Sequence, residues 1–401
     1  IEHVVLEHTT DDERNPVYAT SKPFSVVLPK GEIFFKIVSK SFNTPITAYP
    51  RRHENTSAAI EYMNGREDGN DFFRAEVSHE QTLNDSALNG YSGISTFTSS
   101  ANVRVTRYLE ALGFSAKDTH NRYLYEESSP VANLFLGLKY MIDRDGKDKT
   151  SAYFAEKNHF GDTTLLENQY YLPLGFLTEK ELAEYPFTTN GNAFAFQNGL
   201  FSAATGLDTD VWYRIPGDNL TVSATGMTIT EDNGQGYIKY KDTENKAEAT
   251  FSYIAHRDGF VCIRLDLPKR NDYYVSINGA ELFKETISLP QMMAVGDVKT
   301  GDLIEVRVIC DSGESSTMDV KAAILNHNLF RSGYNKLNVS TWQLTEFEST
   351  RVEGVIHCDR DGLMYTSIPQ NGNWKVNVDG NPVETVLVGD CMAAVPLMQG
   401  T

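Results

Sequence analysis

The amino-acid sequence predicts a β-rich chain, with an α+β domain at residues 1–207 followed by two mostly antiparallel β-sandwich modules at residues 208–330 and 331–401. Three observations support this prediction. The 401 residues exceed one ordinary domain, which holds roughly 100–200 residues. The 29 Gly, 21 Phe and 20 Tyr favour strands joined by tight turns, and the helical pattern ends near residue 207. Finally, a unit of strands and turns occurs twice after residue 258.

Strands are predicted from the N-terminus onward. Residues 23–28 and 33–38 are extended apolar runs on either side of a Pro-Lys-Gly turn, which is typical of a hairpin. Residues 72–77 predict one further strand. Residues 134–142 are almost wholly apolar, so they predict a strand or another buried segment that ends in a charged turn.

Three helices are predicted in the same part of the chain, at residues 55–64, 101–113 and 178–185. Thr56 or Ser57 is suited to cap the first helix, and Gly113 to end the second. In the third, Thr178 and Glu181 have the spacing of a capping box. These helices and strands together predict the α+β domain.

After residue 208 the pattern changes to short strands separated by Gly, Asn and Asp, at residues 221–224, 236–240, 249–254 and 260–265. Residues 259–268 match 362–369, residues 271–279 match 371–380, and residues 292–302 match 391–401. Each copy predicts a strand, a second strand, a tight Asn-Gly or Asp-Gly hairpin and a further strand. In the first copy a strong strand follows at 303–309, and we expect the native chain to supply its missing counterpart after Thr401.

Composition excludes several classes of function. The formal net charge is −18 and the sequence pI is near 4.9, which argues against binding to nucleic acid or to anionic lipid. Cys262, Cys310, Cys358 and Cys391 form no CxxC pair, so we expect neither a metal nor a cofactor, and we expect Cys262, Cys310 and Cys391 to be buried thiols. No apolar run is long enough to cross a membrane.

Three stretches resemble the YfhO family of bacterial membrane proteins, namely residues 84–100, residues 134–142 with 167–176, and residues 367–380. The resemblance implies a parent with many transmembrane helices, which this chain lacks, and an extracytoplasmic position for the present region at the cell membrane. It also implies a glycosyltransferase that uses a lipid-linked sugar to decorate cell-wall polymers such as lipoteichoic acid. In such enzymes the catalytic acid lies on a loop near the membrane, so no catalytic residue is assigned here. The second sandwich resembles galactose-binding-type jelly rolls.

The best candidate for a ligand site is the Gly-, Ser- and Thr-rich stretch before the helix at residue 101. Backbone amides at a helix start, together with hydroxyls, can hold a phosphate or a sugar. The candidate residues are Asn84, Tyr91, Ser99, Ser100 and Asn102. No GKS or GKT follows, so the stretch is not a P-loop, and a capping and packing loop is the alternative.

Tryptophans supply a second set of candidates, because an exposed indole can stack on a sugar ring. Trp374 lies beside Val376 and Val378 in an alternating pattern that favours the core, and Trp212 suits a domain junction. Trp342 is the least constrained and is the candidate for ligand binding. Residues 143–148 and 359–362 resemble calcium loops faintly but lack the full ligand pattern, so plain turns are predicted.

Three functions fit these observations. The first is an accessory outer domain that orients a cell-wall glycan or polymer for the membrane part, which binds the lipid-linked sugar. The second is a non-enzymatic carbohydrate-binding or scaffold module of a membrane complex. The third is a secreted glycoside hydrolase, which requires two carboxylates roughly 5–10 Å apart in a cleft.

Overall fold

The structure is a computed structural model, and it describes residues 9–10, 16–17, 53–66, 71–78, 80, 82–117, 119–126, 129–144, 153–187, 192–242, 247–268, 271–287, 289–310 and 315–400. The chain forms two compact units, residues 1–49 and 50–401. In the first unit β1 (Thr9–Thr10) pairs antiparallel with β2 (Pro16–Val17). The hairpin predicted at residues 23–38 lies outside the described residues.

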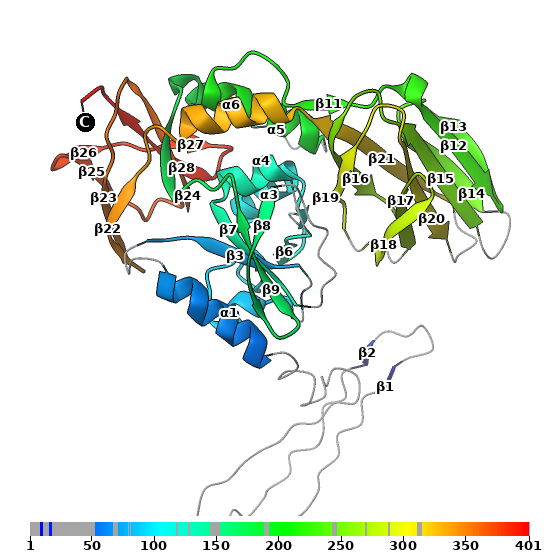
Figure 1. Ribbon diagram of the computed structural model, residues 1–401, viewed down its shortest axis with the longest axis horizontal. Helices are drawn as coiled ribbons and strands as arrows, with labels where there is room; N and C mark the ends of the chain where they lie inside the picture. The colour runs from blue at the N-terminus through cyan, green and yellow to red at the C-terminus, as the bar shows by residue number, and fades with distance from the viewer. Residues whose placement is uncertain are drawn as a thin grey trace, which may run out of the picture. The chain divides into compact units, whose positions relative to one another are not determined.

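Helices and strands alternate in the first part of the second unit (Figure 1). One sheet has the order β3 (Arg74–Val77), β7 (Leu138–Asp143), β9 (Thr163–Asn168) and β8 (Phe154–Phe160), with β3 and β7 parallel. Helix α1 (His53–Arg66) packs on this sheet through Ala59, Ile60 and Met63. A smaller sheet contains β4 (Thr96–Phe97), β6 (Arg122–Leu124) and β5 (Ser115–Ala116). A region of mixed helices and strands before the sandwich is therefore confirmed.

The helix predicted at residues 101–113 is confirmed, with Gly113 as its end, whereas its cap at Asn102 was not predicted. Helix α3 (Val103–Leu112) begins at an Asn102 cap and ends at Gly113, whose φ of 97° suits glycine. Helix α1 is also confirmed, but it begins three residues before Thr56, which is a buried helical residue and not a cap. The apolar stretch at 134–142 divides into the end of helix α4 (Pro130–Phe135) and strand β7.

Two other predictions were wrong, and one further helix was missed. No helix was expected after residue 208, yet α6 (His327–Leu337) lies there, and α5 (Ala193–Thr205) was also not predicted. The helix predicted at 178–185 is a 3₁₀ turn, η1 (Lys180–Glu184), without a capping side chain. Thr178 instead ends β10 (Gly175–Thr178), and its hydroxyl donates to the Leu363 carbonyl at 2.8 Å. Thr178 was expected to cap a helix, but it pairs with β24 in a sheet instead.

Two antiparallel sheets form a sandwich (Figure 1). The first has the order β13 (Met227–Asp232), β14 (Tyr237–Asp242), β21 (Ser315–Leu325), β16 (Gly259–Asp266) and β19 (Gln291–Val298), with β11 (Trp212–Arg214) also on β21. The second has the order β12 (Leu220–Thr225), β15 (Ala247–Ile254), β20 (Leu303–Cys310), β17 (Asp272–Ile277) and β18 (Ala280–Thr286). Alternate residues of both sheets meet in one apolar core, as a sandwich requires.

The sequence repeat has a structural counterpart. Strand β24 (Gly362–Pro369) pairs with β28 (Met392–Leu397) as β16 pairs with β19. The hairpin of β25 (Val376–Val378) and β26 (Asn381–Val383) matches that of β17 and β18. Asn278 and Asp379 have φ of 52° and 50°, and the glycine after each has φ of 79°. Both turns therefore have the left-handed backbone that the Asn-Gly and Asp-Gly pairs predicted.

The sheet of the second copy includes a strand from far upstream. Its order is β10, β24, β28 and β27 (Val386–Val388). Strand β10 pairs with β24 on the side where β21 pairs with β16 in the first copy. A separate hairpin, β22 (Gln343–Glu348) and β23 (Arg351–Val355), precedes β24.

Polar contacts reinforce this link between distant segments. The half-buried Arg74 on β3 donates to the Leu136 carbonyl and the Ser367 hydroxyl, both at 2.7 Å, and to the Ser367 carbonyl at 3.0 Å. Burial lowers the pKa of Arg74 to about 10, so it remains a cation at neutral pH. The buried hydroxyls of Tyr108 and Tyr365 lie 3.1 Å apart.

One large core contains residues from all three predicted ranges, for example Phe135, Phe260 and Tyr365. The boundaries at 207 and 330 stay a prediction. All four cysteines are buried and free, and burial was predicted for Cys262, Cys310 and Cys391.

A glycine contact in this core gives a test of the packing. A Cβ at Gly333 of α6 would lie 2.2 Å from the Phe201 ring, whereas one at Gly65 of α1 meets nothing within 4 Å. We expect Gly333→Ala to lower the free energy of unfolding by about 1–3 kcal/mol through overpacking. Gly65→Ala should raise it by up to about 1 kcal/mol, because alanine favours a helix. Urea unfolding of both variants measures the difference, and equal shifts of the two would contradict the close contact between α5 and α6.

Candidate functional site

Two of the predicted ligand residues, Asn84 and Tyr91, lie beside a buried group of charges. Asn84 precedes helix α2 (Asp85–Asn89), and its carboxamide oxygen accepts from the Phe97 amide at 2.7 Å and the Thr96 hydroxyl at 3.2 Å. Its amide nitrogen donates to the Phe97 carbonyl at 3.0 Å. Through these hydrogen bonds the Asn84 side chain holds β4 against the start of α2.

The start of α3 is also occupied by the protein itself. The Asn102 side chain accepts from the Arg104 amide at 3.0 Å, which is the capping bond of this helix. Ser99 and Ser100 are exposed, and the Ser100 hydroxyl lies 3.2 Å from that of Thr98. The alternative of a capping and packing loop therefore accounts for these contacts, while ligand binding by these residues stays a prediction.

Tyr91 packs against the core below α1, and its hydroxyl is buried. Burial raises the pKa of this phenol far above its usual value, and the charges of Glu76 and Asp85 add to the shift. Asp85 forms a buried ion pair with Arg144. Tyr91 thus belongs to a charged cluster that the sequence did not reveal as a group.

Glu76 is the central carboxyl of this cluster. One of its oxygens accepts from the Ile94 amide at 2.5 Å and the Ser95 amide at 2.6 Å. Burial raises the pKa of Glu76 to about 7, although these hydrogen bonds oppose the shift. At the rim, partial desolvation and the charge of Asp85 raise the pKa of Glu80 to about 7.

Trp342 is half-buried and serves the second copy of the repeat. Its amide donates to the Gly175 carbonyl at 2.9 Å, and its ring lies against Gly175 and Gly354. Trp212 is buried, and its indole nitrogen donates to Gln197 at 2.8 Å, consistent with a junction residue. Trp374 lies half-buried just before β25 and not within a strand.

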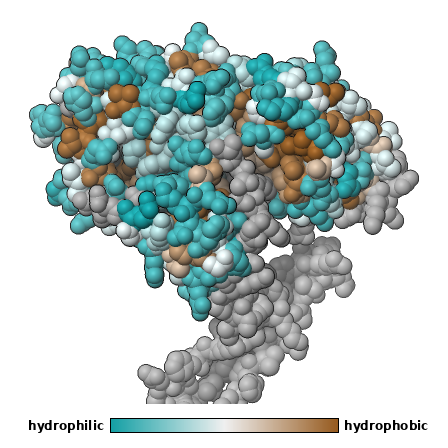
Figure 2. Space-filling view, viewed as in Figure 1, coloured by the Kyte–Doolittle hydropathy of each residue, from teal (hydrophilic) through white to brown (hydrophobic). Residues whose placement is uncertain are grey.

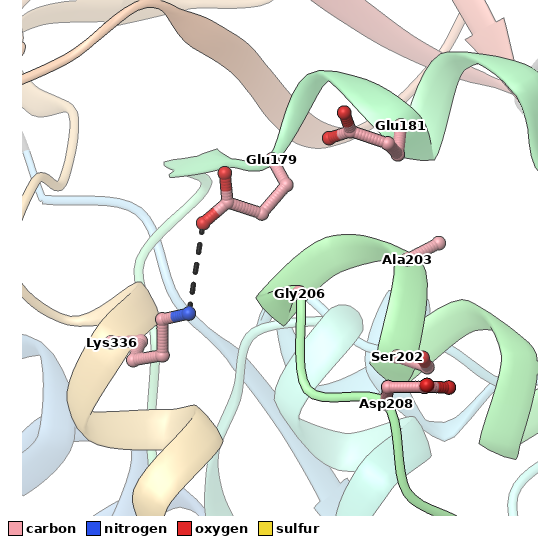
Figure 3. A pocket seen from close by; sticks show the side chains of 7 residues that line it. All are labelled: Glu179, Glu181, Ser202, Ala203, Gly206, Asp208 and Lys336. Atoms are coloured by element: carbon pink, nitrogen blue, oxygen red, sulfur yellow. Dashed lines mark ion pairs between the residues drawn. The ribbon is translucent and has the colours of Figure 1, made fainter.

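A surface hollow of about 430 Å³ provides another candidate site (Figure 3). It lies where η1 and the ends of α5 and α6 meet, and Figure 3 shows Glu179 directed toward Lys336 across its opening. The lining residues are Glu179, Glu181, Ser202, Ala203, Gly206, Asp208 and Lys336.

The charges of the hollow are mostly negative. A Glu179 oxygen lies 3.7 Å from the Lys336 ammonium and 3.5 Å from the Arg360 guanidinium. Lys336 also donates to the Thr205 carbonyl at 2.5 Å, at the carbonyl end of α5, where the helix dipole is negative. With three carboxylates and one ammonium in its lining, the hollow favours neutral or cationic groups over phosphate.

The sequence did not indicate these lining residues as a group. Glu179 and Glu181 fell in a helix that does not form, and α5 and α6, which place Asp208 and Lys336, were not predicted. The signal that identifies α5 is Asn192 as its cap and Gly206 as its end, both of which the structure has.

The described part of the chain has neither a metal-binding cluster nor a membrane-spanning helix. There, no three or more His, Cys, Asp or Glu side chains gather as a metal site would require. Among the described helices, none combines the length and apolar character needed to cross a bilayer.

Comparison with known proteins identifies a family. The sequence model described as "Bacterial membrane protein YfhO" matches residues 34–401. No curated protein matches the chain.

Two solved structures show limited similarity. One is a native family 35 carbohydrate binding module from Clostridium thermocellum, with 9% identity over 28% of this chain and 96% of that chain, at a TM-score of 0.20. The other is the Podospora anserina GH26-CBM35 β-(1,4)-mannanase, with 18% identity over 29% of this chain and 27% of that chain, also at a TM-score of 0.20.

The buried carboxyl of Glu76 predicts a pH dependence of stability. Its folded pKa of about 7 exceeds its ordinary value of 4.5, so the folded state holds this proton more tightly. The free energy of unfolding should therefore fall as pH rises from 4.5 to 7 and level off above that range. When the pH is raised from 5 to 8, the free energy of unfolding should fall by about 2 kcal/mol less in the Glu76→Gln variant than in the parent. Urea unfolding at both pH values, with exposed Glu54→Gln as control, tests this, and parallel profiles for parent and Glu76→Gln would refute it.

Proposed function

Since this chain belongs to the YfhO family of bacterial membrane proteins, we propose that residues 50–401 are an extracytoplasmic binding domain. In this proposal the domain holds a cell-wall glycan or polymer and presents it to the membrane part of the protein. The membrane part is a glycosyltransferase that takes sugar from a lipid carrier and adds it to a polymer of the lipoteichoic acid type. The domain itself binds and orients without catalysing the transfer.

The hollow between η1, α5 and α6 is the observation that carries the binding role. Its volume of about 430 Å³ is within the range of roughly 300–1,000 Å³ that is common for ligand sites. Carboxylates at Glu181 and Asp208, the Ser202 hydroxyl and the Lys336 ammonium offer acceptors and donors for the hydroxyl groups of a sugar. These groups come from three elements packed on one core, which fixes their spacing.

Charge narrows the class of ligand. A chain with a net charge of −18 repels a bare phosphate polymer at long range, and the carboxylates of the hollow repel it at contact. A neutral sugar, or a polymer whose hydroxyls carry aminoacyl esters, avoids this repulsion. The ammonium of such an ester can pair with Glu181 or Asp208.

The same carboxylates support glycoside hydrolysis as a second candidate function. A hydrolase requires one carboxyl that donates a proton and another that acts as nucleophile or base. The Glu179 carboxylate is already paired with Lys336 at 3.7 Å and with Arg360 at 3.5 Å. This arrangement favours binding over hydrolysis.

Titration with a glycerol phosphate oligomer that carries D-alanyl esters tests the proposal. We expect saturable binding by calorimetry, and an at least fivefold weaker affinity for the Glu181→Gln/Asp208→Asn double variant, because two partners of the ammonium are lost. Glu54→Gln, on the distant helix α1, is the matched control and should bind as the parent does. Equal or tighter binding of the oligomer after its esters are removed would contradict the proposed charge selection. Release of reducing sugar from a neutral glycan would favour the hydrolase.

A further inference from the structure

The two copies of the repeat differ at the position of β20. In the first copy, β20 lies between β15 and β17 and pairs with both. In the second copy, β23 takes the place of β15 and β25 that of β17. Within the described residues, β23 pairs with β22 alone and β25 with β26 alone, so each has one open edge.

Both hairpins of the second copy cover the same small core. Val376, Val378 and Val383 of the β25–β26 hairpin pack against a cluster that includes Leu177, Met364, Val395 and Leu397. Ile356, just after β23, and Trp342, just before β22, pack against the same cluster. We call the space between the open edges of β23 and β25 the strand slot.

Burial differs between the copies where β20 has no counterpart. Tyr273 and Val275 on β17 are 0% exposed, whereas their counterparts Trp374 and Val376 are half-buried. Likewise Tyr253 on β15 is buried and its counterpart Ile356 is half-buried. The alternation is the same, so the inward faces are already oriented for a strand that covers them.

Apolar surface also collects near the strand slot. Figure 2 shows apolar side chains at the surface in the region of β22, β23, β25 and β26. Val355 on β23 is 66% exposed. Phe347 on β22 is 39% exposed and stacks on Phe72, with ring centroids 4.6 Å apart. Exposed apolar residues beside open strand edges are a feature that proteins usually cover.

The turn that leads into β20 is reproduced in the second copy. Two hydrogen bonds recur at equivalent residues of the copies. The Gly301 amide donates to the Ala255 carbonyl at 2.8 Å, as the Gly400 amide donates to the Cys358 carbonyl at 3.0 Å. The Thr300 amide donates to the Asp258 carboxylate, as the Gln399 amide donates to the Asp361 carboxylate, both at 2.8 Å. The backbone at Gly400 is therefore held as the backbone at Gly301 is, two residues before β20 begins.

The hairpin turn before β26 contains a residue, Asp379, that matches the residue fixing the start of β20 in the first copy. Asn278 accepts from the Leu303 amide at 2.9 Å, and its own amide donates to the Leu303 carbonyl at 2.8 Å, which fixes the first residue of β20. Its counterpart Asp379 has nearly the same backbone and an exposed carboxylate. That carboxylate is placed to accept from the amide of a first strand residue.

We propose that the strand slot accepts an antiparallel strand that enters directly after Thr401 and joins β23 to β25 in one sheet. Its chemistry is that of β20, with apolar residues at alternate positions facing the cluster. In the first copy Ile304 lies opposite Ile277 and Val306 opposite Val275. By this register, the second and fourth residues of the incoming strand lie opposite Val378 and Val376.

The test is a chain of residues 1–401 extended by a copy of residues 303–310, compared with the unextended chain under reducing conditions. A control extension carries serine at the three positions copied from Ile304, Val306 and Val308. Hydrogen exchange of the amides at residues 351–355 and 376–378 is measured by mass spectrometry. We expect exchange at least tenfold slower in both segments with the first extension than with the serine control.

Every other result overturns the proposal. Equal exchange in all three chains means that the slot does not accept a strand. Protection of one segment alone means that β23 and β25 do not share an incoming strand. Protection by a free peptide of residues 303–310, without protection by the extension, assigns the slot to a separate partner chain. Exchange at residues 303–310 of the original β20 is the internal control and should not change.

Discussion

The pairing of β10 with β24 is the constraint on which the second half of the structure depends. Four residue pairs join segments that are nearly 190 positions apart in the chain, and the Thr178 hydroxyl and the Arg74 guanidinium add side-chain bonds to the same strand. Without β10, β24 would be an edge strand with unpaired amides and carbonyls. The repeat therefore completes its sheet with a strand from the N-terminal part of the chain, in the position that β21 fills in the first copy.

This pairing also holds the aromatic core and the hollow in place. Phe176 on β10 packs against Phe135 of α4 and Tyr365 of β24, with ring centroids 6.0 and 5.3 Å apart. Glu179 follows β10 directly, and the Lys336 that faces it lies on α6, whose Phe330 packs in the same core. A ligand in the hollow thus contacts groups whose positions are set by long-range packing.

The sequence predicted the helix ends and hairpin turns that depend on neighbouring residues. The end of α3 at Gly113 and the left-handed turns at Asn278 and Asp379 depend on neighbouring residues alone, and the sequence predicted all three. The Asn102 cap is equally local, but Asn102 was interpreted as a ligand residue. Thr178 shows the limit, because its capping pattern is real but pairing with Leu363 outweighs it. The hollow was not predicted since its groups come together through α5, α6 and β10, and no spacing in the sequence records that contact.

The hollow and the strand slot share one short turn, at residues 358–361. Asp361 and Cys358 hold the backbone near Gly400, and Arg360 between them reaches Glu179 at the hollow. The two sites are therefore joined through adjacent residues of one backbone segment, so a change in this turn reaches contacts of both.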